Sequence, residues 1–218
     1  MIERPAWIAE VARSTLGYLG LLHGPDGVMA CVIGHATHAD AARALEAHQR
    51  CLPVTPLPDG RLNSGPPSAK LSDQQAQRAC LAGLKDHAGL KGLADLRADV
   101  SKSRLMERLL RRAEGACDDF LDIPLPLDDR TPFQFRVLTC CRAIPWGETR
   151  TYGQLARAAG SPGAARAVGQ VMATNRLPLI VPCHRVVPAS GGLGGFSAPQ
   201  GTRLKRSLLE QEQLEPES

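Results

Sequence analysis

A cysteine followed directly by a histidine and an arginine interrupts an apolar stretch near the C-terminal end of the chain. Leu177 to Val187 reads LPLIVPCHRVV, so Cys183, His184 and Arg185 stand within what would otherwise be a core strand. A thiol with a pKa of about 8.5 is only slightly ionised at neutral pH, and a reactive cysteine therefore needs a base or positive surroundings. His184 and Arg185 are the candidates for that role.

The same residues also fit a cysteine without chemistry. Adjacent residues of a regular strand point to opposite faces, so His184 cannot contact the Cys183 sulfur unless a bend at Pro182 or a bridging water intervenes. For an isolated Cys-His pair, an inert thiol buried in a core strand is the alternative. The rest of the chain has to decide between the two.

Two short helices joined by a tight turn are predicted upstream of Cys183. Thr151 precedes a helix over residues 152–159 that Gly160 ends. Ser161 and Pro162 then supply the cap and first position of a second helix that runs through about Thr174. Two helices in this order are typical of DNA-reading units.

The second of these helices has one apolar face and one face of small side chains. The periodicity places Ala164, Ala167, Val168, Val171 and Met172 inward, and Arg166, Gly169, Gln170 and Ala173 outward. Small side chains let a helix approach a groove closely, and Arg166 is long enough to reach between bases. A packed helix with a surface arginine fits the same periodicity.

The N-terminal half is predicted to be α/β. Leu16–Ile33 reads as two strands joined by a turn over residues 23–27, and Thr37 caps a helix through Arg50. A Pro/Gly-rich loop over residues 51–69 and a helix over Ser72–His87 are predicted to follow.

A further helix is predicted over Ser101–Asp119, with Leu105, Leu109 and Ala113 on one stripe. Its arginines fall elsewhere and are interpreted as a solvated face, with a nucleic-acid contact as the alternative; they are Arg104, Arg108, Arg111 and Arg112. Two closely spaced prolines, Pro124 and Pro126, predict a connector over Asp122–Asp129, after which a helix is expected over Pro132–Ala143.

The composition of the 218 residues is that of a globular domain, with 43% hydrophobic and 22% charged residues. No apolar run approaches the roughly 20 residues of a membrane helix, and no signal-peptide pattern is present, so a cytoplasmic protein is expected. Seven cysteines without a regular framework favour free thiols. A net charge of +4 permits contact with nucleic acid but does not require it.

Four ordered motifs resemble the O6-alkylguanine-DNA alkyltransferases, also called methylated-DNA-protein-cysteine methyltransferases. They are IPWGETRTYGQLA at Ile144–Ala156, AARAVGQVMATN at Ala164–Asn175, VPCHRVV at Val181–Val187 and KRSLLEQE at Lys205–Glu212. The resemblance implies single-turnover repair of double-stranded DNA, in which an alkyl group moves irreversibly from a flipped O6-alkylguanine, with O4-alkylthymine as a further substrate, to Cys183.

The resemblance also assigns catalytic roles. Cys183 accepts the alkyl group, His184 takes the thiol proton through a water, and Glu212 orients His184. Tyr152 lies beside the 3′ phosphate and donates to guanine N3, and Asn175 holds the turn before the active-site strand.

Further roles by resemblance concern DNA and the base. Arg166 enters the base stack, on a DNA-binding surface with Ala165, Gly169, Gln170 and Tyr152. The carbonyls of Cys183 and Val186 accept from the guanine amino group, and the Ser197 amide donates to O6. Phe196 stands where the family usually has Tyr, the loop over Phe196–Lys205 is about two residues longer than in relatives, and Arg176 replaces a common Pro.

The implied fold is a ribonuclease-H-like α/β N-terminal domain followed by a mostly α C-terminal domain, which contains a helix-turn-helix and a short strand with the active-site cysteine. Expected boundaries are residues 1–121 with an insertion at about 51–100, a connector at 122–130, and the C-terminal domain at 131–218. A monomer without metal or other cofactor is expected, and the scattered N-terminal histidines and cysteines fit no zinc pattern. A non-catalytic sensor of alkylated guanine and a Cys-His hydrolase or transferase of small molecules are the alternatives.

Overall fold

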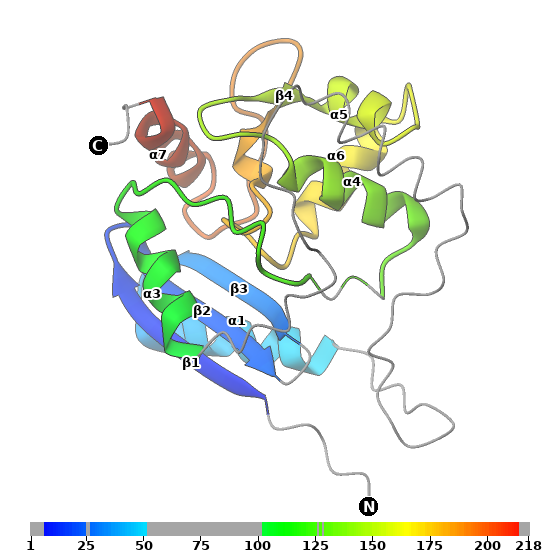
Figure 1. Cartoon of the computed structure of the whole chain (residues 1–218). Coiled ribbons are helices and arrows are strands. Elements are labelled where there is room, and N and C mark those ends of the chain that lie inside the picture. The colour runs from blue at the N-terminus through cyan, green and yellow to red at the C-terminus, as the bar shows by residue number, and fades with distance from the viewer. Residues whose placement is uncertain (1–6, 25–26, 52–101, 126, 128, 214–218) are drawn as a thin grey trace, which may run out of the picture.

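The computed structural model describes residues 7–24, 27–51, 102–125, 127 and 129–213. Figure 1 shows a small sheet with helices against its two faces, and a second group of helices packed beside it. The loop predicted over residues 51–69, the helix predicted over Ser72–His87 and most of the proposed insertion lie outside the described residues.

Three antiparallel strands form the sheet, in the order β1 (Ile8–Ser14), β2 (Gly17–Gly24) and β3 (Gly27–His35). The predicted hairpin is confirmed as β2 and β3, whose register pairs Leu21 with Cys31. Strand β1 was not predicted, because residues 8–14 include polar side chains on a half-exposed edge.

The alternation of side chains along the strands produces two apolar faces. Leu22, Ala30 and Val32 pack with Ala41 and Leu45 of helix α1 (His38–Cys51). The Thr37 hydroxyl accepts from the Asp40 amide at 3.1 Å, which confirms the predicted cap. The opposite face joins the main core, to which helix α3 (Lys102–Ala113) contributes Leu105 and Leu109.

Helix α3 ends at Ala113, six residues before the predicted end. Arg108 donates to Asp118 and Asp122 at distances of 2.6–2.8 Å, and the side chain of Arg112 is 1% exposed. Arg104 and Arg111 are exposed. The interpretation of these arginines as a solvated face is therefore wrong for Arg108 and Arg112.

The C-terminal half begins with two helices whose starts match the sequence prediction. Helix α4 (Pro132–Arg142) has a capping box between Thr131 and Gln134, and helix α5 (Tyr152–Ala158) has one between Thr151 and Gln154. In each box the threonine hydroxyl accepts from a backbone amide and the glutamine side chain accepts from another, so two unpaired helical donors are satisfied.

Helix α6 (Ala165–Ala173) begins three residues later than predicted. Residues 161–163 form a turn instead, in which the Ser161 carbonyl accepts from the Ala164 amide at 3.1 Å and Gly163 has a φ of +89°. Val168, Val171 and Met172 are buried as predicted, whereas Ala167 is exposed. A turn that needs a positive φ cannot continue a right-handed helix.

The strand expected over residues 177–187 is mostly absent. Cys183–Arg185 form a single 3₁₀ turn, η1, and only Val186–Val187 (β5) are extended, in a parallel pair with β4 (Arg150–Thr151). Two prolines remove ladder donors from this segment, and Leu179 has a φ of +71°. Helix α7 (Thr202–Gln213) ends the described chain.

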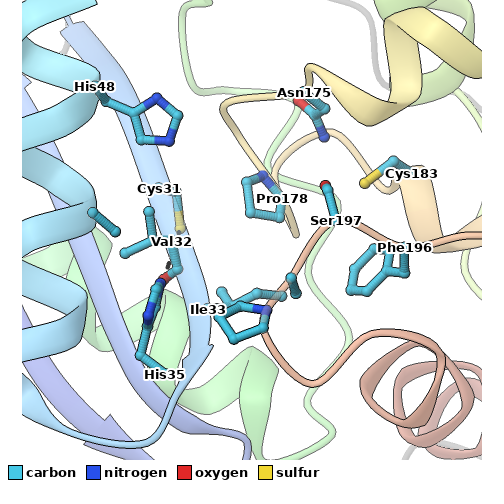
Figure 2. Close-up of a pocket in the computed structure, with 13 residues that line it drawn as sticks. Cys31, Val32, Ile33, His35, His48, Asn175, Pro178, Cys183, Phe196 and Ser197 are labelled. Atoms are coloured by element: carbon cyan, nitrogen blue, oxygen red, sulfur yellow. Dashed lines mark hydrogen bonds between the residues drawn. The ribbon is translucent and has the colours of Figure 1, made fainter.

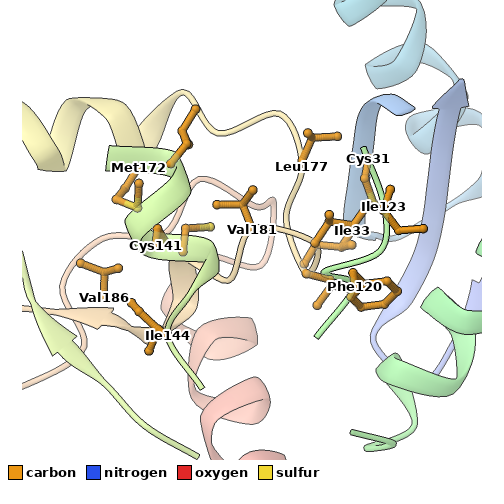
Figure 3. Packing of buried hydrophobic residues seen from close by; sticks show 14 of the residues in the cluster. Cys31, Ile33, Phe120, Ile123, Cys141, Ile144, Met172, Leu177, Val181 and Val186 are labelled. Carbon is orange, nitrogen blue, oxygen red and sulfur yellow. The ribbon is translucent and has the colours of Figure 1, made fainter. Parts of the chain in front are cut away.

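One continuous apolar core joins the sheet to the C-terminal helices, and Figure 3 shows Cys31 and Ile33 facing Leu177 and Val181 across it. Polar contacts run beside this core. The Cys31 amide donates to the Arg176 carbonyl at 2.7 Å, and Gln200 Nε2 donates to the carbonyls of Leu16 at 2.8 Å and Gly34 at 3.0 Å. The segments that contain Arg176 and Gln200 are thereby fixed to the sheet.

At Gly34, strand β3 approaches helix α7 closely. The φ of Gly34 is +76°, and a Cβ there would lie 2.6 Å from Cδ2 of the buried Leu204 of α7. We expect Gly34→Ala to lower the free energy of unfolding by about 3 kcal/mol, from strain plus the clash. Gly163→Ala, also at positive φ but with nothing within 4 Å, should cost about 1 kcal/mol. Equal losses in urea unfolding would contradict the packing of β3 on α7.

Candidate active site

Glu212 of α7 is a buried carboxylate to which several donors converge. Its oxygens lie 2.7 Å from His184 Nε2 and 2.8 and 3.0 Å from Arg185 Nε and Nη2, and Arg112 Nη2 donates to Oε1. Burial raises the pKa of Glu212, but hydrogen bonds from His184 and Arg185 outweigh it and lower the pKa to about 2. The group is therefore ionised at neutral pH.

His184 is held by one ring nitrogen and presents the other. Because Nε2 faces a carboxylate oxygen, Nε2 carries the hydrogen and Nδ1 carries the lone pair. Nδ1 is buried and has no hydrogen-bond partner among the described residues. Burial lowers the pKa of His184 to about 4, although Glu212 opposes this shift. His184 is thus a neutral imidazole with an available proton acceptor.

Cys183 begins the 3₁₀ turn and is 6% exposed. Burial raises its pKa, whereas a hydrogen bond from the Asn175 side chain and the charge of Lys205 lower it. The sulfur is therefore a thiol at rest. Arg185, the second candidate for activating this thiol, donates to Glu212 and to the Ile144 carbonyl.

A cavity of about 210 Å³ opens beside Cys183. Figure 2 shows the sulfur turned towards it, with Asn175 and Ser197 nearby and strand β3 on the opposite wall. Cys31 of β3 also lines the cavity, and burial raises its pKa to about 12. Of the two cysteines in the described lining of this cavity, Cys183 is the one with neighbouring groups that lower its pKa.

Asn175 and Lys205 fix the segments around the sulfur. Asn175 Nδ2 donates to the Val181 carbonyl and its Oδ1 accepts from the Leu177 amide, both at 3.0 Å, so it closes the turn after α6. The fully buried Lys205 donates to the carbonyls of Val186 at 2.7 Å and Gly195 at 3.5 Å. Lys205 thereby joins β5 to the loop that contains Gly195.

The other predicted residues divide between the cavity and an outer surface. Phe196 is half-buried and Ser197 is exposed, and both line the cavity. Val186 is buried, and its carbonyl accepts a hydrogen bond from Lys205. Tyr152 is half-buried, 4.0 Å from a Cβ placed on Gly169, and burial raises its pKa, so its phenol stays protonated.

On the outer surface of α6, Arg166 and Gln170 are exposed, while Ala165 and Gly169 are half-buried. These residues do not join the Cys183 cluster.

Three participants were missed from the sequence. Arg112 donates to Glu212. The Trp146 ring stacks on the Arg112 guanidinium, whose carbon lies 4.2 Å from the ring centre. Arg112 follows Leu105 by seven residues and Leu109 by three, so its place on the buried stripe could have been recognised. Lys205 is the first residue of the motif over Lys205–Glu212, and the resemblance assigns it no role.

Other features of the described chain bear on cofactors and surroundings. Cys31, Cys117, Cys141 and Cys183 are free, but Cys140 is disulfide-bonded, so the expectation of free thiols is wrong for Cys140. Among the residues placed here, no three His, Cys, Asp or Glu side chains converge on a possible metal position. Within the same ranges, no helix is long and apolar enough to cross a bilayer.

Residues 132–214 match a family model described as the DNA-binding domain of 6-O-methylguanine DNA methyltransferase. The chain is 48% identical over 95 residues, 43% of its own length and 56% of the relative's, to the methylated-DNA–protein-cysteine methyltransferase of Mycobacterium bovis. It is 45% identical over 91 residues, 41% and 54% of the two lengths, to the constitutive enzyme of that name from Bacillus subtilis. It thus spans about half the length of these curated relatives.

The crystal structure of the Mycobacterium tuberculosis O6-methylguanine methyltransferase superposes with a TM-score of 0.54 and 25% identity, over 95% of this chain and 93% of that one. Both are mixed α/β proteins. Residues 132–214 are therefore similar to the DNA-binding domain of the 6-O-methylguanine DNA methyltransferase family. The resemblance predicted from its motifs is confirmed.

The neutral state of His184 predicts how stability depends on pH. Its pKa is about 4 in the folded chain, against 6.5 ordinarily. Between these values the unfolded chain binds a proton that the folded chain does not, so the free energy of unfolding falls as the pH drops from about 6.5 towards about 4. In urea unfolding, the free energy of unfolding of His184→Gln should fall less steeply with decreasing pH in that window than the free energy of unfolding of wild type. His38→Gln, at an exposed position, is the control, and equal slopes for wild type and His184→Gln would contradict a buried neutral imidazole.

Proposed function

We propose that this protein repairs alkylated DNA by moving an alkyl group from O6 of guanine irreversibly to the sulfur of Cys183. One observation carries the proposal: the Cys183 thiol lies on a cavity wall, and the next residue, His184, has an unpaired Nδ1 while Glu212 holds its other nitrogen. A match to the family's DNA-binding domain supports it.

The transfer balances with groups that the chain supplies. The Cys183 proton passes to Nδ1 of His184, and the thiolate attacks the alkyl carbon. A carbon–sulfur bond forms, the carbon–oxygen bond at O6 breaks, and guanine leaves with the electron pair. Because a guanine anion is a poor leaving group, Tyr152, kept protonated by burial, donates a proton to the base.

The thioether that results has no ready hydrolytic route, so each molecule acts once. The proton taken up by His184 returns to Tyr152 or to solvent. In this scheme neither a metal nor an organic cofactor takes part.

Access to O6 requires that the base leave the duplex. Extrusion costs a few kcal/mol, which an inserted side chain and backbone contacts offset. Arg166 fits the inserted role because it is exposed on α6, where Gln170 is also exposed and the small Ala165 and Gly169 leave room. In this proposal α5 and α6 act as a helix-turn-helix, and contacts to phosphate and shape suit a search for rare lesions.

The base itself is proposed to lie against the cavity. Carbonyls of Cys183 and Val186 accept from its amino group, the Ser197 amide donates to O6, and Asn175 maintains the turn. Phe196 has no phenolic hydroxyl for O6, which is expected to change rate or preference for alkyl size.

The proposed domain architecture follows the same family. Residues 1–121 form the ribonuclease-H-like unit, 122–130 the connector and 131–218 the DNA-binding unit. The three-stranded antiparallel sheet followed by α1 supports the first of these. A cytoplasmic location and a monomeric state stay predictions.

Mass spectrometry tests the transfer. After incubation with duplex oligonucleotide containing O6-methylguanine and proteolysis, we expect the peptide with Cys183 to gain one methyl group, at most one per molecule. Cys183→Ala should show no gain, while Cys31→Ala, which removes the other thiol of the cavity, should react as wild type. Tight binding of the oligonucleotide without a mass change would indicate a sensor instead and overturn the proposal.

Arg166→Ala tests base extrusion separately. We expect repair of duplex DNA to slow on the order of tenfold or more, because nothing fills the space left by the base. Reaction with free O6-benzylguanine, which needs no extrusion, should stay unchanged. Arg206→Ala, at an exposed position on α7, is the matched control, and equal losses on both substrates would refute the role of Arg166.

A further inference from the structure

A guanidinium from the N-terminal half of the chain lies at the centre of the Glu212 site. Arg112 is in the last turn of α3, its side chain is 1% exposed, and its Nη2 donates to Glu212 Oε1. The Trp146 ring stacks on it. The neighbouring Ala113 carbonyl accepts from Gln211 Nε2 at 3.0 Å, which joins α3 to α7 at this level. Arg112 is therefore held in place on several sides.

Arg112 is not needed to neutralise Glu212. Arg185 already contacts both carboxylate oxygens, with Nε on Oε2 at 2.8 Å and Nη2 on Oε1 at 3.0 Å. This pairing of one guanidinium with one carboxylate balances the buried charge. With Arg112 added, the cluster carries one surplus positive charge while His184 is neutral.

The surplus charge lies against the imidazole. Arg112 Nη2 is 3.4 Å from His184 Nε2. Since Nε2 carries a hydrogen directed at Glu212, the two nitrogens are both donors and do not bond to each other; both point to Oε1. A second proton on the ring would place an imidazolium beside a guanidinium in a site that solvent does not screen.

Charged groups reach His184 from three elements. Glu212 comes from α7 and favours the protonated ring, while Arg112 from α3 and Arg185 from η1 oppose protonation. Cys183, the preceding residue, is a thiol at rest. Arg112 is the member of this set that the N-terminal half of the chain contributes.

We infer that Arg112 is a positioning residue, which keeps His184 neutral and its Nδ1 free to accept the Cys183 proton. The N-terminal half thereby sets the proton affinity of the acceptor used in the C-terminal half. The link to catalysis rests on the proposed function, whereas the electrostatic coupling between Arg112 and His184 does not.

The coupling is tested by nitrogen NMR titration of His184 in the full chain. Arg112→Gln keeps a donor for Glu212 and removes the charge, Arg112→Lys keeps the charge, and Arg111→Gln alters the exposed neighbour. We expect Arg112→Gln to raise the pKa of His184 by about one unit or more. Arg112→Lys and Arg111→Gln should titrate as wild type. An unshifted His184 in Arg112→Gln would overturn the inference.

The rate of reaction with free O6-benzylguanine, measured against pH, gives a second readout. A protonated His184 cannot accept the thiol proton, so the acid limb of Arg112→Gln should move to higher pH by the same shift, with Arg112→Lys restoring it. A loss of rate that is uniform in pH would instead mean that Arg112 only supports packing, against the inference. Absence of any reaction in wild type would refute the proposed function and leave the NMR result to decide the coupling.

If Arg112→Gln does not fold, nitrogen NMR of His184 in the wild-type protein still tests the inference. The inference requires that His184 carry its hydrogen on Nε2 and remain neutral to below its ordinary pKa of about 6.5. A hydrogen on Nδ1, or protonation at or above that pH, would overturn it.

Discussion

The carboxylate of Glu212, buried among two guanidiniums and one imidazole, is the interaction on which the site depends. A lone carboxylate in this position would be too costly to ionise; Arg185 balances its charge, and Arg112 adds a further donor. Because these partners come from η1 and α3, and Glu212 from α7, one charge fixes three segments that are distant in sequence. The same charge sets the tautomer of His184.

A neutral pair of thiol and imidazole follows from that arrangement. Burial raises the pKa of Cys183 and lowers that of His184, so both shifts disfavour a resting ion pair. A thiol that ionises only when a substrate is present is protected from other electrophiles, because the thiolate is the nucleophilic form. For a protein proposed to act once per molecule, this protection preserves the capacity for repair.

Local signals in the sequence predicted most helices and the Cys183–His184 pair, and the family resemblance added Glu212. Neither source indicated the residues that support these three. Thr131 and Thr151 mark helix starts through contacts within four residues, which a sequence displays directly. Arg112 meets Glu212 a hundred residues away, and nothing local distinguishes it from the exposed Arg111 except its place on the apolar stripe. The strand predicted before Val187 failed because proline and a left-handed Leu179 outweigh apolar composition.

The protonation state of Cys183 in the resting protein tests the account most directly. Thiolate absorbs in the ultraviolet where thiol does not, so the difference between wild type and Cys183→Ser across pH reports this one sulfur. The account predicts no thiolate signal at neutral pH and ionisation only above the ordinary range for cysteine. A thiolate signal at neutral pH would show a resting ion pair and contradict the neutral site built around Glu212.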